Sequence, residues 1–253
     1  IFDHMIQKQT NHLLNEIKNS KDLENKIIGC TAIILTGLCY KINKNYLEIG
    51  LSFLKKITAS SIDNQGFTKS RNIKQLIFFL KYFVLIREWF KEAQVEVPDH
   101  IEENIYYFGQ GYAFIRQNIA TDLLFNGNNN SNTYDLDNYL KRLGYKFKNE
   151  NKDYGGYIIL KNKKICLAMD AGSSPNSKYT HDYQSGALSF EIISNGKKLI
   201  TNCGYYKKNN QNLNEISKSS AVHSTLIIDD NSSCKFTKKK DKLILKTGLK
   251  ITQ

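Results

Sequence analysis

The stretch GALSFEIISNGKKLITNCG, residues 186–204, decides how the second half of the chain folds. On both sides of Ser194–Lys197 the sequence has a period of two, which is typical of strands. Asn195-Gly196 at the centre is the pair that a two-residue type I′ turn prefers. We therefore predict a β-hairpin with strands at 187–193 and 199–203.

The period of two begins near Asn151 and continues toward the end of the chain. Further strands are predicted at Tyr157–Leu160, Ile165–Met169 and Leu243–Leu245. The stretch SSAVHSTLIIDD, residues 219–230, is also typical of a short strand that ends in a turn, and it carries His223. Residues 151–253 are therefore expected to form an antiparallel β-sandwich.

The first half has a different period. From Phe2 to about Leu143 hydrophobic residues recur at helical spacing, and turn-like stretches such as Asp63–Gly66 separate the periodic segments. The predicted helices are 3–19, 22–41, 44–60, 70–94, 98–120 and 133–143. Helices joined in this up-and-down way pack as hairpins, so residues 1–148 are expected to form an α/α bundle or toroid. The expected fold class is α+β multidomain.

The chain of 253 residues, 41% of them hydrophobic, is long enough for one large domain or two smaller ones. It begins at Ile1 instead of methionine and stops at Gln253, just after a strand-like run. We interpret these ends as those of a fragment. The helical domain is expected to lack its N-terminal part, and the sandwich its C-terminal part.

The formal net charge of +12 fits either a polyanionic partner or a lysine-rich proteome. The basic residues are scattered along predicted helices and turns, with the densest run at Lys238–Lys240. No stretch interleaves arginine with aromatic residues as nucleic-acid surfaces often do. We therefore expect no nucleic-acid partner.

The five cysteines are widely spaced and form no CxxC pair, so the sequence encodes neither a zinc ribbon nor a redox motif. Most of them are interpreted as small core residues. The longest apolar run, Ile27–Tyr40, is interrupted by glycine and threonine and is too short for a membrane span. It is predicted to be a buried helix.

Three blocks of the β half resemble, in order and spacing, the C-terminal β domain of the heparinase II/III-like polysaccharide lyases. They are MDAG at Met169–Gly172, GALSFEI with ITNCG in the hairpin above, and AVHSTLIIDDNSS at Ala221–Ser233. In the helical half, IILTGLCY at Ile33–Tyr40 and DNQGFTKS at Asp63–Ser70 look like a toroid helix end and a loop of that family. The resemblance implies an α/α toroid followed by an antiparallel β-sandwich.

The resemblance also implies an activity, namely cleavage of uronic-acid-containing polysaccharides by β-elimination. In that reaction a weakly acidic C5 proton is removed while the neighbouring carboxylate is neutralised. The implied partner is an acidic polysaccharide, and the implied location is the periplasm or cell envelope. The alternative is a catalytically impaired member that acts as a glycan-binding or envelope-structural protein.

A zinc ion held by histidines and an aspartate is a further implication of the resemblance. His223 takes the position of one ligand histidine. The other two ligand positions fall at Gln184 and Asn202, which are poor zinc ligands compared with histidine and carboxylate. The zinc site is therefore expected to be degraded, unless a one-residue shift of the loop lets His181 and Asp182 restore a partial site.

Catalytic residues are expected in both halves. NHLLNEIKN, from Asn11 and His12 onward, resembles the Asn-His helix start of the family, although spacing measured back from Gly37 points to a different pair. An exposed Asn-His on a solvated helix face is the alternative. The family tyrosine falls near Ile73, which has no hydroxyl.

In the β half, His181 is the histidine best placed to act as acid or base, and Tyr183 is a candidate phenol. Lys218, Tyr205 and Tyr206 are candidates for substrate binding. The alternative for each tyrosine is packing and hydrogen bonding at a sheet edge. For Asp170 and Glu191, two roles stay open: each either positions an imidazole or caps the end of a hairpin.

Overall fold

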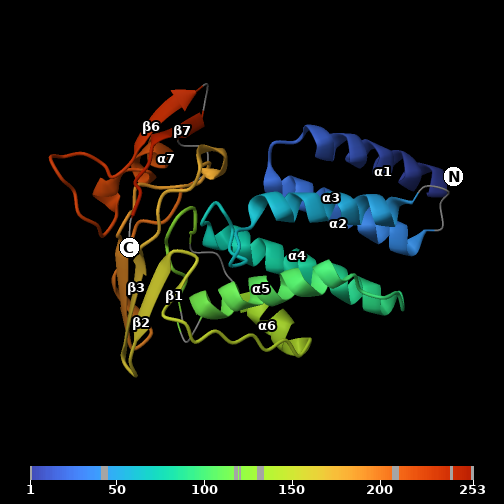
Figure 1. Cartoon of the computed structure of the whole chain (residues 1–253), viewed down its shortest axis with the longest axis horizontal. Helices are drawn as coiled ribbons and strands as arrows, with labels where there is room; N and C mark the ends of the chain where they lie inside the picture. Colours follow the sequence, from blue (N-terminus) through green and yellow to red (C-terminus); the bar gives the residue numbers. More distant parts are fainter. Residues whose placement is uncertain are drawn as a thin grey trace. The chain divides into compact units, whose positions relative to one another are not determined.

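The computed structural model describes residues 2–40, 45–116, 119, 121–129, 134–206, 211–239 and 242–251. Helices come first along the chain and antiparallel sheets follow (Figure 1). By contacts the chain divides into two compact units. The first comprises residues 1–63 and 77–108, and the second comprises residues 64–76 and 109–253.

The predicted helices are present. They are α1 (Phe2–Asn19), α2 (Leu23–Cys39), α3 (Tyr46–Ser61), α4 (Ile73–Glu92), α5 (Asp99–Arg116) and α6 (Tyr134–Arg142). The predicted ends at 41, 44, 120 and 133, and residues 117 and 118 inside the fifth predicted helix, lie outside the described residues. A short helix, α7 (Gln211–Ser217), follows later in the chain and was not predicted.

Capping residues fix where α2 and α3 begin. The Asp22 carboxylate accepts backbone N–H groups of Glu24 and Asn25 at 2.9 and 3.2 Å, and the Asn45 side chain accepts that of Glu48 at 3.2 Å. Each cap thereby satisfies N–H groups that have no partner within the helix. The helix starts that the sequence pattern predicts therefore have a local chemical cause.

Glycines let the first three helices pack closely in the first unit. A Cβ atom at Gly37 would lie 2.4 Å from the backbone nitrogen of Leu47, and one at Gly50 would lie 2.8 Å from the side chain of Ile34. Neither distance is compatible with a real side chain, so α2 and α3 approach at a spacing that only glycine permits. Helices α1, α2 and α3 lie side by side (Figure 1).

The core of the first unit is aromatic. Phe79 and Phe83 of α4 are fully buried, and both rings contact Phe108 of α5 at centroid distances of 5.8 and 5.2 Å. The two α4 residues are four positions apart and so share one face of the helix. The helical period of the sequence therefore corresponds to a buried stripe.

The β half contains an antiparallel sheet with strand order β1-β2-β3-β4-β5 and a separate hairpin (Figure 1). The sheet strands are β1 (Asp153–Tyr154), β2 (Tyr157–Lys161), β3 (Ile165–Asp170), β4 (Phe190–Ser194) and β5 (Lys197–Ile200). The hairpin pairs β6 (Lys235–Lys239) with β7 (Lys242–Thr247). Helices followed by antiparallel sheets confirm the expected fold class.

The predicted hairpin at 186–204 is present but shorter than expected. Asn195 and Gly196 have φ values of +47° and +77°, as a type I′ turn requires. Strand β4 begins only at Phe190 because Leu188 has a φ of +59° and the Ser189 N–H donates to the Gly186 carbonyl at 3.0 Å. A turn therefore replaces the first three residues of the predicted strand.

The strand predicted for His223 is wrong. Residues Ser220–Val222 form a 3₁₀ turn, which the Ser219 hydroxyl caps by accepting the N–H of Ala221 at 3.3 Å. His223 follows with extended backbone and belongs to no strand. The hydroxyl of Ser220 is buried and donates to the Ser185 carbonyl at 2.6 Å, so side-chain bonds replace the ladder that a strand would need.

Cys30, Cys166 and Cys234 are buried, as predicted for core residues, and Cys39 and Cys203 are exposed. All five thiols are free. Within the described ranges, no helix combines the length and the apolar character that crossing a membrane requires.

Candidate active site

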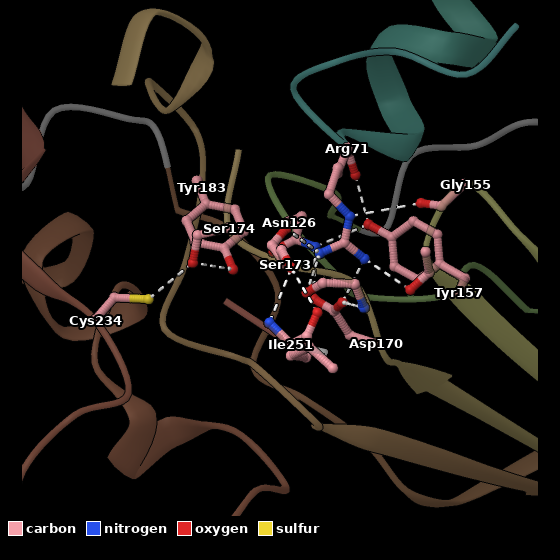
Figure 2. Close-up of polar contacts among 12 residues, drawn as sticks. Arg71, Asn126, Gly155, Tyr157, Asp170, Ser173, Ser174, Tyr183, Cys234 and Ile251 are labelled. Carbon is pink, nitrogen blue, oxygen red and sulfur yellow. Dashed lines mark hydrogen bonds and ion pairs between the residues drawn. The ribbon is translucent and has the colours of Figure 1, made fainter. Parts of the chain in front are cut away.

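The candidate site lies in the second unit and depends on a buried ion pair that holds the loop before α4. The Arg71 guanidinium, on this loop, contacts the Asp170 carboxylate at the end of β3 with an N–O distance of 2.5 Å (Figure 2). The two residues are 8% and 1% exposed. Burial lowers the pKa of Arg71, but the Asp170 carboxylate more than compensates, so the net pKa lies above the ordinary value.

The remaining hydrogen-bonding capacity of this pair is used by neighbours. Arg71 donates to the carbonyls of Gly156 at 2.8 Å and Gly172 at 2.9 Å. The second Asp170 oxygen accepts from the Asn126 amide at 2.7 Å, and that amide also donates to the Tyr157 hydroxyl at 2.8 Å (Figure 2). Because each group is satisfied, the cluster has the chemistry of a structural clamp.

The clamp positions Asn72, the next residue along the loop. Its side-chain amide donates to the Asp182 carboxylate at 3.4 Å. Gly127 permits this approach, because a Cβ atom there would lie 2.4 Å from the Asn72 amide nitrogen and 2.7 Å from the Asp182 Cβ. Segments that are far apart in sequence thus meet at Asp182.

Asp182 binds His181. The imidazole Nδ1 lies 2.6 Å from a carboxylate oxygen of Asp182, and the His181 side chain is 54% exposed. Because a carboxylate only accepts hydrogen bonds, Nδ1 carries the proton and Nε2 of the neutral ring has a lone pair. No described residue binds that Nε2. This tautomer is the one that a general base requires.

Lys218 and Tyr205 are buried residues that interact with the His181–Asp182 pair. The Lys218 ammonium donates to the His181 carbonyl at 2.7 Å and lies over the Tyr205 ring at 5.6 Å. Burial lowers the pKa of Lys218 to about 8, opposed by the charge of Asp182. Burial and the Asp182 charge both raise the pKa of Tyr205.

Lys218 and Tyr205 are 3% and 6% exposed, so their polar groups act on Asp182 and His181 and not on a molecule in solvent. Tyr206 is 49% exposed and remains a candidate for substrate contact. Tyr183 is 1% exposed, and its hydroxyl lies 3.1 Å from that of Ser174 (Figure 2). Burial raises the pKa of Tyr183, which gives this phenol the properties of a packing residue.

The other predicted catalytic pair lies in the first unit, on α1. The Asn11 side chain accepts a hydrogen bond from the Tyr46 hydroxyl at 3.1 Å. His12 is exposed on the same helix. These contacts give Asn11 a role in the packing of α1 against α3.

The three predicted zinc-ligand positions lie in a network of hydrogen bonds. The carbonyl of Ser217 accepts from the Gln184 amide at 2.6 Å and from His223 Nε2 at 3.1 Å. The Gln184 amide also donates to the Gly204 carbonyl at 2.9 Å. Asn202 is 2% exposed, and its carbonyl oxygen accepts from a backbone N–H at 3.0 Å.

This donor set does not fit a zinc ion. Zinc takes thiolate, imidazole or carboxylate ligands, whereas Gln184 and Asn202 offer neutral amides and the Nε2 of His223 bears a proton directed at Ser217. Within the described part of the chain, no group of three or more histidine, cysteine, aspartate and glutamate side chains is arranged to hold a metal. His181 and Asp182 form only the pair already described.

Sequence reasoning missed Arg71 and Asn72, which position Asp182. The family-like loop at Asp63–Ser70 ends one residue before Arg71. A lone arginine in a polar loop gives no sign of burial. The one available signal was the resemblance itself, which placed this loop beside catalytic residues.

The model of the heparinase II/III-like C-terminal family matches residues 149–243. A search of curated proteins returned no match. Among solved structures, a crystal structure of heparinase III aligns with a TM-score of 0.72 at 16% identity, covering 92% of this chain and 43% of that chain. A mutant of the heparan sulfate lyase HepC from Pedobacter heparinus aligns with a TM-score of 0.72 at 11% identity, covering 92% and 42%.

A further heparinase III structure aligns with a TM-score of 0.70 at 17% identity, covering 89% of this chain and 40% of that one. The chain thus spans about two fifths of the length of the solved structures that it matches. Residues 149–243 therefore match the heparinase II/III-like C-terminal family, and the chain shares the fold of the matched part of heparinase III.

Proposed function

We propose that this protein is a polysaccharide lyase that cleaves uronic-acid-containing glycans by β-elimination, with His181 as the residue that moves the proton. The observation that carries the proposal is the bond of 2.6 Å between His181 Nδ1 and Asp182 on an imidazole that is 54% exposed. Of the sequence-predicted catalytic residues, His181 alone combines exposure with an orienting carboxylate among the described contacts.

The proposed step follows from this geometry. The Nε2 lone pair of His181 takes the proton from C5 of the uronic acid, and the C5–H electrons form the C4–C5 double bond. The C4–O bond breaks, and the leaving oxygen takes up a proton from the imidazolium that His181 has become, which restores the neutral ring. Asp182 keeps Nδ1 protonated and stabilises the imidazolium that forms, as an orienting carboxylate does in other acid–base pairs.

A basic groove in the second unit is a further observation that favours an anionic substrate. Its volume is about 580 Å³. Its lining includes the aromatic residues Tyr112, Tyr145 and Phe147, the basic residues Arg116, Lys141, Lys146, Lys148 and Lys161, and the acidic residues Asp137 and Glu150. Basic side chains that outnumber acidic ones in a groove raise the local concentration of a polyanion.

The alternative is a glycan-binding protein without catalytic activity. The observation that favours it is the replacement of a metal-binding donor set by the neutral amides of Gln184 and Asn202. Binding alone produces no new double bond, so the two functions predict different products.

The test is an ultraviolet absorbance assay for unsaturated sugar ends, run on a panel of uronic-acid polysaccharides. We expect the wild-type protein to produce absorbance and His181→Ala to reduce the rate by at least about 100-fold. His4→Ala is the matched control, because His4 is exposed on α1. Glycan binding without absorbance across the panel would instead establish the non-catalytic function.

His12→Ala in the same assay tests the other predicted catalytic histidine. Because His12 is exposed on α1 and lies in a different unit from His181, we expect a rate close to that of wild type. A loss as large as that of His181→Ala would place the proton transfer on α1 and contradict the proposed role of His181.

A further inference from the structure

Gln184 and His223, at two of the three zinc-ligand positions, already bind other groups. At the third, the Asn202 carbonyl oxygen accepts from the Ser224 N–H, while the amide nitrogen has no partner among the described residues. Gln184 uses its whole amide: the oxygen accepts from the Gly127 N–H at 3.1 Å, and the nitrogen donates to the carbonyls of Gly204 and Ser217. Gln184 is fully buried. One side chain therefore joins three segments that are distant in sequence, which is the role that a structural metal ion has in other domains.

His223 binds one of the carbonyl groups that Gln184 also binds. Its Nε2 and the Gln184 amide share one acceptor, the Ser217 carbonyl at the end of α7. A carbonyl only accepts, so Nε2 carries the proton and offers no lone pair to a metal.

Nearby carboxylates are engaged as well. Asp170 and Glu191 are buried carboxylates of the same unit as His223. Asp170 is paired with Arg71, and Glu191 accepts from Lys198 at 2.9 Å and from the Asn202 N–H at 2.9 Å. Neutral amides and one imidazole do not compensate the charge of a divalent ion. Neither carboxylate is available to balance that charge, because both already have cationic partners.

We propose that the Gln184–Ser217–His223 network is a metal-independent replacement for a zinc site, so that the β domain reaches its full stability without a bound metal. The inference does not depend on catalytic activity. It rests on the saturation of Gln184, the protonated Nε2 of His223 and the neutral side chain at Asn202.

The first test measures metal content and thermal stability of the wild-type protein. We expect purified, dialysed protein to contain far less than one zinc per chain, and its Tm to be the same with EDTA and with added zinc chloride. One zinc per chain after dialysis, or a Tm that EDTA lowers by several degrees, would overturn the proposal.

The second test removes the network while keeping its volume. Gln184→Met deletes three hydrogen bonds, and we expect its Tm to fall by several degrees. Gln9→Met on α1 is the matched control, because Gln9 is exposed, and its Tm should stay close to that of wild type. An unchanged Tm for Gln184→Met would show that the network does not stabilise the domain.

The third test restores a metal-binding donor set. The double variant Gln184→His/Asn202→Asp supplies an imidazole and a carboxylate beside His223. We expect it to bind zinc with a stoichiometry near one in calorimetry, and to gain Tm when zinc is added. A double variant that is folded by circular dichroism but binds no zinc would show that these two side chains are not what excludes the metal.

Discussion

Two aspartates of the second unit, Asp170 and Asp182, each bind a basic side chain at about the same distance, and they serve different purposes. Asp170 is 1% exposed, and its partners Arg71 and Asn126 are buried with it. Asp182 holds an imidazole that is 54% exposed. The distance within a pair therefore does not reveal its role, whereas the exposure of the partner side chain does.

The buried pair should have the larger effect on stability. Arg71→Met leaves the Asp170 carboxylate buried without its cation, so we expect the free energy of unfolding to fall by about 3–5 kcal/mol. Urea denaturation measures this change. The control Arg142→Met removes an exposed arginine and should change it by less than about 0.5 kcal/mol. Equal losses of unfolding free energy for the two substitutions would show that the buried Arg71 contributes no more to stability than an exposed arginine.

Lys218, which donates to the carbonyl beside Asp182, should make stability depend on pH. Its pKa is lowered from 10.5 to about 8, so between these values the unfolded chain binds more protons than the folded protein. This term therefore raises stability as pH rises from about 8 to 10.5, by up to about 3 kcal/mol.

Comparison with Lys218→Met isolates that contribution, because the other titrating groups are the same in both proteins and their effects on stability cancel. We expect the wild type to gain stability relative to the variant as pH rises through this window, as measured by urea denaturation at several pH values. A difference between the two proteins that does not change with pH would mean that the Lys218 ammonium is well solvated.

The exposed pair should have its effect on turnover. Asp182→Asn places an amide N–H opposite His181 Nδ1 and favours the wrong tautomer, so we expect kcat to fall by about 100-fold, or about 2.7 kcal/mol, on the substrate found in the absorbance assay. The free energy of unfolding measured in parallel should change by less than for Arg71→Met. Unchanged turnover would contradict the role of this carboxylate.

An ion pair in the first unit should have the smallest effect on stability. Arg87 Nε contacts Glu102 at 2.7 Å, and the Glu102 side chain is 44% exposed. Water screens such a pair, so Glu102→Gln should lower the free energy of unfolding by less than about 1 kcal/mol. A loss comparable to that of Arg71→Met would show that exposure is not what separates these pairs.

Much of the fold could be predicted because its signals are local. Helical spacing in segments such as Leu76–Phe90 and the Asn195-Gly196 turn depend on residues that are close in sequence. The strand expected at His223 failed because serine side chains, Ser219 and Ser220 among them, bind neighbouring backbone groups and form a turn instead.

The site could be predicted only in part, because its contacts are long-range. His181 was identified from the sequence, and its partner Asp182 follows it directly. The ion pair between Arg71 and Asp170 joins residues 99 positions apart, and no local pattern indicates it. The burial of Lys218, which the sequence favoured as a substrate-binding residue, likewise depends on segments brought together by folding.

The most direct test of the site is the tautomeric state of its histidines, measured by nitrogen-15 NMR of the imidazole rings at a pH where they are neutral. Signals are assigned with His181→Ala and His223→Ala. The structure predicts the Nδ1–H form for His181, held by Asp182, and the Nε2–H form for His223, held by Ser217. Finding the Nε2–H form at His181 would contradict its role as a base, because the proton would occupy the nitrogen that must receive one.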